Sequence, residues 1–182
     1  MTLPEVMGNR FLYFGYGSNM LFKRITILNK SAVRKDFGKL KDYKLEFFTS
    51  SSKWQGAPAT IVPKPGESVM GAIYEINLEH MQSLDEQESV PQGIYIPLSL
   101  PIEKSNGETV TCRVYRLRNL PEELPKDAPV PMNRQPSHTY LKTIVKGAIE
   151  TRLPEDYIQF LKSFKHNENL VPELENELEL RD

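Results

Sequence analysis

The sequence predicts an α+β fold with a mixed or antiparallel sheet. Short β-like runs follow one another with few helices between them, which is typical of such sheets rather than of a doubly wound parallel sheet. The clearest helical periodicity lies near the carboxyl end, at residues 138–150 and 156–164, and Pro154 is well placed near the start of the second helix.

The chain has 182 residues, of which 39% are hydrophobic and 26% charged. Because domains most often run to about 100–150 residues, we expect one domain, at residues 11–166, preceded by an N-terminal tail at residues 1–10. Residues 167–182 are acidic and poor in apolar side chains, so we expect a flexible C-terminal tail there.

The balance of charge argues against a polyanionic partner. Lys and Arg number 23 against 24 Asp and Glu, so neither a nucleic acid nor a membrane surface is implied. The single cysteine, Cys112, allows no internal disulfide, and Glu5 interrupts the stretch where a signal peptide would be apolar. No apolar run approaches the roughly 20 residues of a membrane span. We expect a cytoplasmic protein.

The first structural unit is a strand, a polar turn and a helix. Residues 11–16 are rich in aromatic side chains and predict a buried strand, which ends at Gly17-Ser18-Asn19. Residues 20–29 follow at helical spacing, and Ser18 or Asn19 can supply the N-cap.

The middle of the chain predicts a series of strands. Residues 39–48 alternate loosely, and two further β-like runs, 59–62 and 69–76, flank the turn-like Pro65-Gly66, so we expect these two runs to pair with each other.

A short helix and a hairpin follow. Asn77 can cap a helix that ends near Pro91. Residues 94–100 then alternate as an edge strand, and Asn106-Gly107 predicts a hairpin turn into a strand at 110–117. Residues 120–136 are rich in proline and acids and predict a long loop, a lid or a linker.

Chemistry is most plausible at the turn, at the acidic end of the short helix and at Tyr140. Negative charge is disfavoured at a helix carboxyl end, so a buried carboxylate there has a raised pKa and suits general acid/base catalysis. Free N–H groups at the turn favour an anion, and Gly17 lets a ligand approach the backbone. An ordinary tight turn and a solvated acidic face are the plain alternatives. The acidic string is Asp85, Glu86, Gln87 and Glu88.

Residues 13–20 and 84–88 together strongly resemble the animal γ-glutamylcyclotransferases. The resemblance spans about residues 11–164, and other matching pieces occur in the same order, such as Trp54-Gln55-Gly56 and Gly71-Ala72-Ile73-Tyr74. It implies a mixed, mostly antiparallel β-barrel flanked by helices, no cofactor, no metal, and commonly a homodimer. The implied reaction closes a γ-glutamyl amino acid, which is the small-molecule substrate, into 5-oxoproline and releases the free amino acid.

The resemblance also implies roles for individual residues. Glu88 matches the family's catalytic acid/base. The residues implied in substrate binding are Tyr13, Phe14, Gly15, Tyr16, Gly17, Ser18, Asn19, Tyr95 and Tyr140. The alternatives are a related cyclotransferase acting on γ-glutamyl-amines or glutathione, and a catalytically silent relative that binds a metabolite or a protein.

Two departures from the family's pattern concern the backbone. Ser89 stands where members usually have glycine, and Ala57-Pro58 replaces a glycine-containing pair, which puts the local path of the chain in question. Trp54 either lines the pocket or fills the core. The three histidines show no metal-ligand spacing, and we expect Cys112 to be buried packing.

Overall fold

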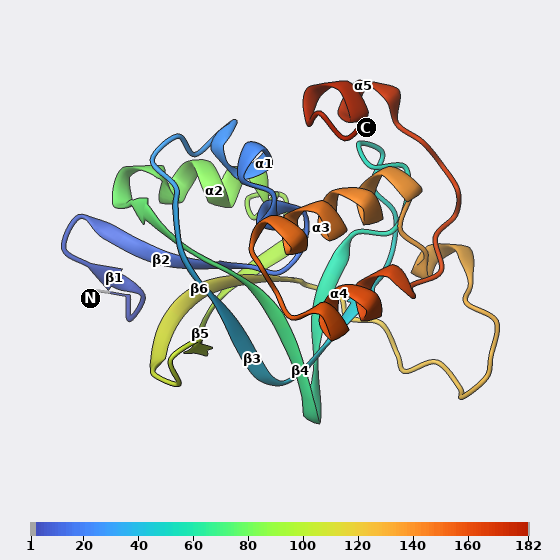
Figure 1. Cartoon of the computed structure of the whole chain (residues 1–182), viewed down its shortest axis with the longest axis horizontal. Coiled ribbons are helices and arrows are strands. Elements are labelled where there is room, and N and C mark those ends of the chain that lie inside the picture. The colour runs from blue at the N-terminus through green and yellow to red at the C-terminus, as the bar shows by residue number, and fades with distance from the viewer. Residues whose placement is uncertain (1–2, 182) are drawn as a thin grey trace.

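A computed structural model describes residues 3–181, and its strands form a closed barrel (Figure 1). The strand order β1-β2-β4-β3-β5-β6, with an additional β2–β6 pairing, closes a ring of β2, β4, β3, β5 and β6. Neighbouring strands are antiparallel except β2 and β6, which are parallel where Tyr13 faces Arg113. The strands are β1 (Val6–Met7), β2 (Arg10–Gly15), β3 (Val33–Phe47), β4 (Ala59–Asn77), β5 (Tyr95–Lys104) and β6 (Thr109–Leu117). The predicted mixed, mostly antiparallel barrel is confirmed.

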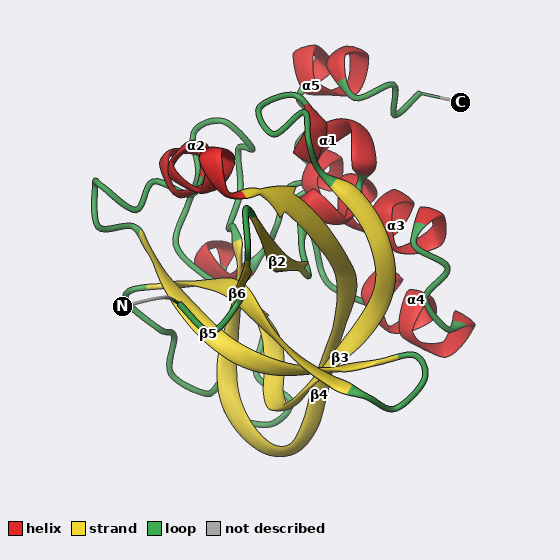
Figure 2. Cartoon of the chain, turned by 90° about the vertical axis from the view of Figure 1, so that its left-hand side faces the viewer, coloured by secondary structure: helices red, strands yellow, loops and turns green. Residues whose placement is uncertain are grey.

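Helices cover the barrel unevenly. In Figure 2, α1, α3, α4 and α5 stand on one side of the barrel and α2 stands apart from them. The helices are α1 (Phe22–Thr26), α2 (Met81–Gln87), α3 (His138–Glu150), α4 (Glu155–Lys162) and α5 (Pro172–Glu177), with short 3-10 turns at Ser18–Met20, Leu78–His80 and Met132–Arg134. No helix in residues 3–181 is long and apolar enough to cross a membrane.

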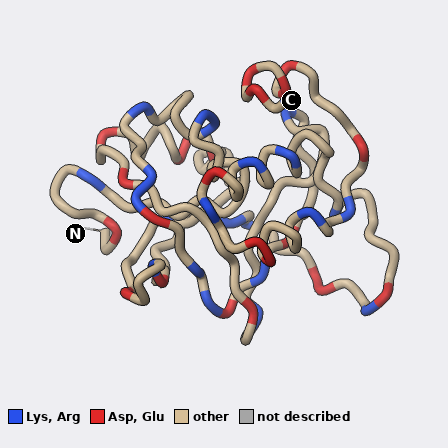
Figure 3. The backbone as a smooth tube through the Cα atoms, in the orientation of Figure 1, with Lys and Arg blue, Asp and Glu red and all other residues tan. Residues whose placement is uncertain are grey.

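The barrel interior and the contacts of α3 form one hydrophobic core. Residues 11–15 of β2 are buried without alternation, because the barrel packs against one face of the strand and helices cover the other. Charges of both signs are distributed along the whole chain, as Figure 3 shows.

One long strand replaces the predicted hairpin around Pro65-Gly66. Both predicted runs belong to β4 and pair with β3, where the register moves from Lys41 opposite Ser68 to Tyr43 opposite Pro63. The turn bulges out between these pairs and is tied to β3 by a 2.9 Å hydrogen bond from the Gly66 amide. The predicted pairing of the two runs is therefore wrong, because β3 is long enough to pair with both.

The helix predicted at residues 20–29 is much shorter. Leu21 is extended, and α1 begins after it without a side-chain cap, so neither Ser18 nor Asn19 caps the helix. The cause is close packing of α3, since a Cβ added at Gly147 would lie only 2.5 Å from the Leu21 nitrogen. The turn is therefore positioned by α3 and not by a helix of its own.

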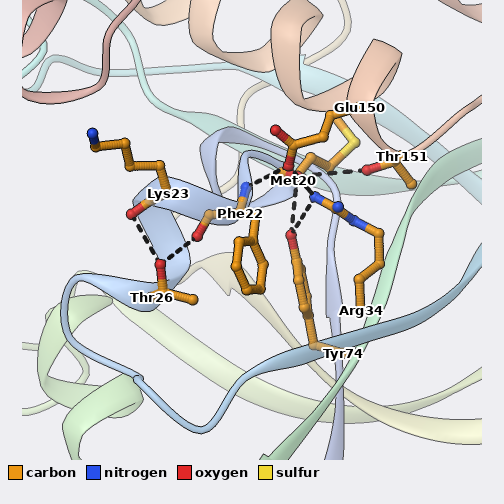
Figure 4. Close-up of polar contacts among 8 residues, drawn as sticks. All are labelled: Met20, Phe22, Lys23, Thr26, Arg34, Tyr74, Glu150 and Thr151. Atoms are coloured by element: carbon orange, nitrogen blue, oxygen red, sulfur yellow. Dashed lines mark hydrogen bonds and ion pairs between the residues drawn. The ribbon is translucent and has the colours of Figure 1, made fainter.

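Polar contacts fasten this turn to the sheet (Figure 4). The carbonyl oxygen of Met20 accepts hydrogen bonds from Arg34 Nη2 at 2.6 Å and from the Tyr74 hydroxyl at 2.9 Å. Glu150, at the end of α3, accepts from the same Arg34 nitrogen at 2.5 Å. Side chains from β3, β4 and α3 thus fix the position of the turn between β2 and α1.

The chain ends differ from the predicted tails. Near the amino end, Glu5 is buried and its Oε1 lies 3.0 Å from Arg113 Nη1. Beyond residue 166, the chain folds into α5 and packs Val171, Leu174, Leu178 and Leu180 into the core. The acidic composition of this segment drew attention away from the spacing of its apolar side chains. That spacing puts them on one face of a short helix, which packs against the rest of the protein.

Candidate active site

A small cavity lies where β2 and β6 end and β5 begins. Its volume is about 40 Å³, and we refer to it as the inner pocket. Its walls come from four strands, the turn after β2, the end of α2 and helix α3. The lining residues are Tyr13, Tyr16, Gly17, Ser18, Asn19, Ala59, Glu88, Tyr95, Tyr115 and Tyr140.

Two of the residues predicted for substrate binding do not line this pocket. Phe14 is fully buried, because its side chain leaves the strand on the face opposite Tyr13. Gly15 lies at the end of β2 against β4, where the close approach depends on Gly71, since a Cβ added at Gly71 would lie 2.5 Å from the Gly15 carbonyl oxygen. The other predicted residues are brought together in its wall, although they are up to 127 positions apart, as Tyr13 and Tyr140 are.

Tyrosine hydroxyls hold the rim of the pocket. Tyr16 donates to the carbonyl oxygen of Tyr115 at 2.6 Å, and Tyr95 donates to that of Ala59 at 2.6 Å. The Tyr140 hydroxyl accepts from the Ala59 amide at 3.0 Å, which leaves its own proton free for a ligand. These bonds join α3 and the starts of β4 and β5 at one point.

Asn19 connects Tyr13 to Glu88. Its Nδ2 donates to the Tyr13 hydroxyl at 3.0 Å and to Glu88 Oε1 at 3.2 Å. The Tyr13 hydroxyl accepts this bond and therefore keeps its proton for another acceptor. Asn19 thus sets the direction of the carboxylate rather than capping a helix.

Glu88 has the electrostatic character expected of an acid/base group. It follows the last residue of α2, where peptide carbonyls point toward it. Burial raises its pKa from the ordinary value of 4.5 to about 7; the nearby cation of Arg24 opposes this shift, and the charge of Asp85 adds to it. Near neutral pH the group exists in both protonation states, so it can accept a proton and return it.

The turn after β2 presents donors to the same pocket. Within residues 3–181, the backbone N–H groups of Gly17 and Ser18 have no hydrogen-bond acceptor. A Cβ added at Gly17 would lie 3.6 Å from the Tyr140 hydroxyl, in the space a ligand would use. Two unpaired donors beside a carboxylate with a pKa near 7 suit a substrate that carries both an anionic and an ionisable amino group.

The chain is similar to known proteins in sequence and in structure. The model of the AIG2-like family matches residues 68–161. The γ-glutamylcyclotransferase of Mus musculus is 39% identical over 165 residues, which are 88% of this chain and 82% of the mouse protein. The γ-glutamylcyclotransferase of Bos taurus is 38% identical over 165 residues, which again are 88% of this chain and 82% of the bovine protein.

A solved structure named γ-glutamyl cyclotransferase superposes with a TM-score of 0.83 at 34% identity, covering 93% of this chain and 98% of that one. The chain belongs to the γ-glutamylcyclotransferase family. The match to the family model includes Glu88, Tyr95, Tyr115 and Tyr140, and it begins after the turn that β2 enters.

The structure shows the backbone at both departures from the γ-glutamylcyclotransferase pattern. Ser89 has φ +54°, in the left-handed region that glycine favours, so serine adopts this conformation at a cost in strain. Ala57 is buried, and its amide donates to the Gln135 carbonyl at 2.9 Å. Trp54 has both roles left open by the sequence, because it is buried, stacks on Tyr140 at 4.7 Å and lines a second cavity.

The sequence did not lead us to the network of charged and hydrogen-bonded side chains that lies beneath the pocket. Asp85 accepts from Arg113 Nη2 at 2.9 Å and from the hydroxyl of Tyr115, and Arg113 in turn pairs with buried Glu5. Tyr115 packs edge-on against Tyr13, at 5.9 Å between ring centroids. The available signal was alternation in β6, where Arg113 and Tyr115 share a face.

The remaining residues singled out in the sequence lie away from the pocket. Cys112 is fully buried packing, as predicted, and burial raises its pKa to about 12. His138 and His166 stack on each other at 4.6 Å. Within residues 3–181, no three His, Cys, Asp or Glu side chains are grouped to hold a metal ion.

Proposed function

We propose that this chain cyclises γ-glutamyl amino acids to 5-oxoproline and releases the free amino acid, with Glu88 as general acid/base. The observation that carries the proposal is the Glu88 carboxylate, whose pKa is about 7, in a pocket that also offers unpaired backbone donors. Its relatives from mouse and cow are named γ-glutamylcyclotransferases.

The reaction is mostly a problem of positioning. The α-amino group and the γ-carbonyl belong to one molecule, so the enzyme has to fold the substrate rather than bring in a second reactant. Glu88 takes a proton from the ammonium group, and the freed nitrogen attacks the γ-carbonyl carbon. The bond from that carbon to the departing nitrogen then breaks as Glu88 returns the proton to the departing amine. The attacking nitrogen, which still carries two protons after ring closure, gives up the second through Glu88 to the departing amine. The ring nitrogen of 5-oxoproline thus keeps one proton, and the amino acid leaves as an ammonium.

The pocket residues supply the folding of the substrate. The N–H groups of Gly17 and Ser18 can bind the α-carboxylate or the oxyanion that develops on the γ-carbonyl. The hydroxyls of Tyr13 and Tyr140 retain protons to donate. The rings of Tyr95 and Tyr140 wall the pocket and reduce the access of water.

The test replaces Glu88 by glutamine and measures 5-oxoproline directly. Glu88→Gln keeps the shape but cannot accept the ammonium proton, so we expect turnover to fall about 100-fold or more. Glu86→Gln is the matched control, because Glu86 lies on the same helix and is exposed. In the wild type, kcat/KM should fall as the pH drops below about 7, because Glu88 must be ionised to act as base. Near-normal turnover by Glu88→Gln would contradict the assignment.

We also propose that the enzyme is cytoplasmic and homodimeric. A single, buried cysteine suits a reducing compartment, and the homodimer is supported by the resemblance to the family. Light scattering coupled to gel filtration measures the oligomeric state, and a monomer at micromolar concentration would contradict it.

A further inference from the structure

A second and larger cavity continues from the inner pocket, and we call it the outer chamber. Its volume is about 430 Å³, and it shares Ser18, Glu88, Tyr95 and Tyr140 with the inner pocket. Whatever group is attached to the reacting carbonyl must therefore extend past Glu88 into this chamber. The chamber's own chemistry then decides which leaving groups fit.

Arg24 is the unusual residue in the chamber wall. It lies on α1 and is only 7% exposed. Its two terminal nitrogens lie 2.6 and 3.1 Å from one atom of the Gln87 carboxamide, which must be the oxygen because guanidinium nitrogens only donate. Within residues 3–181, its Nε has no hydrogen-bond partner.

The other buried arginines show what Arg24 lacks. Arg113 lies 3.0 Å from Glu5 and 2.9 Å from Asp85, and Arg134 lies 3.1 Å from Glu46. No carboxylate of residues 3–181 lies within ion-pair distance of Arg24. Glu88 acts on Arg24 only at longer range. Because a buried charge without a direct ion-pair partner is costly, an anionic ligand would supply the contact that the fold lacks.

The surroundings of Arg24 favour an anion. Lys53 also lines the chamber, and among the lining residues that the structure describes, Glu88 at the inner end is the only acidic one. The guanidinium carbon of Arg24 lies 5.8 Å from the Trp54 ring centroid, and Trp54 packs on Tyr140. The wall therefore combines cations with an aromatic surface immediately outside the inner pocket.

We propose that Arg24 binds the carboxylate of the departing amino acid and so selects γ-glutamyl amino acids over γ-glutamyl amines. This inference rests on the proposed function. In such a substrate, the carboxylate carbon is two bonds from the nitrogen that Glu88 must protonate, and Arg24 contacts Gln87, the neighbour of Glu88 in sequence. A leaving group without that carboxylate leaves Arg24 without its partner. In glutathione the corresponding carboxyl is amide-bonded, and the next carboxylate lies three bonds further from the reacting nitrogen.

The test compares two substrates that differ only in this group, γ-glutamyl-alanine and γ-glutamyl-ethylamine. We expect the wild type to prefer γ-glutamyl-alanine about 100-fold in kcat/KM, and Arg24→Met to reduce that preference to a few-fold. Arg24→Lys should retain part of it. Because the fraction of folded enzyme cancels in the ratio, a partly unfolded variant still gives a valid answer.

Two further variants serve as comparisons. Lys23→Met removes an exposed cation from the same helix, where Lys23 pairs with Glu179 at 2.6 Å, and should leave the ratio unchanged. If Lys53→Met abolishes the preference and Arg24→Met does not, the anchor is Lys53 and the inference is overturned. It is also overturned if the wild type shows no preference. If neither compound yields 5-oxoproline, the proposed function fails, and this inference with it.

Discussion

Replacing Glu88 by glutamine should stabilise the protein at neutral and alkaline pH while removing its activity. The pKa of Glu88 is raised from 4.5 to about 7, so the folded protein holds this proton more tightly than the unfolded chain does. Rising pH therefore favours unfolding of the wild type over this interval. Glutamine has the same shape and no titration, so the variant does not lose this stability.

The magnitude follows from the shift. One pKa unit corresponds to about 1.4 kcal/mol, so the two proteins should differ by about 3 kcal/mol in free energy of unfolding above about pH 7. The difference should shrink as the pH falls and vanish below about pH 4, where both states carry the proton. All other titrating groups cancel in the comparison.

Urea unfolding at a series of pH values measures this difference. The chain has one tryptophan, Trp54, which is buried, so its fluorescence reports unfolding. Glu86→Gln, an exposed site on the same helix, should show no such pH dependence. A Glu88→Gln advantage that does not change with pH would refute the reasoning, because it would show that the carboxylate titrates alike in both states.

Three further predictions concern Tyr140, the C-terminal segment and Ser89. Tyr140→Phe should reduce kcat/KM a few-fold, because the Ala59 amide loses its hydrogen-bond acceptor. Tyr140→Ala should reduce kcat/KM much more, because the ring that stacks on Trp54 is lost. A larger loss in Tyr140→Phe than in Tyr140→Ala would contradict this. Deletion of the chain after Val171 should lower the free energy of unfolding by several kcal/mol, at about 1.5–3 kcal/mol for each of three buried leucines. Thermal unfolding measures this loss, and an unchanged melting temperature would show that the segment is dispensable. Ser89→Gly should raise stability by about 1 kcal/mol by relieving the left-handed strain, with turnover unchanged.

The sequence correctly predicted the elements whose structure is determined by residues close together in the chain. The bounds of α3 agree with its periodicity, and Ser137 caps it by accepting from the Tyr140 amide at 3.0 Å. The hairpin at Asn106-Gly107 also occurs as predicted, with Gly107 at φ +88°. These features depend on residues within a few positions of each other.

The misplaced elements depend on contacts between distant segments. The helix after the turn is short because Gly147 packs against Leu21, and no property of residues 20–29 reveals that. The C-terminal segment folds because Thr139 and Lys142 on α3 both bind buried Glu175. An acidic composition alone predicts a free tail, since it does not show where a matching surface lies.

The charge balance at Glu88 shows why the site itself could be predicted only in part. Its acidic string, including Asp85, was visible in sequence, but the burial that raises its pKa and the opposing effect of Arg24 arise from tertiary packing. Removing Arg24 would therefore act in two ways, by taking away a carboxylate ligand and by raising the pKa of Glu88. The second effect changes the base itself and applies equally to γ-glutamyl-alanine and γ-glutamyl-ethylamine. It cancels in their ratio, so only the loss of carboxylate binding can change the preference between them.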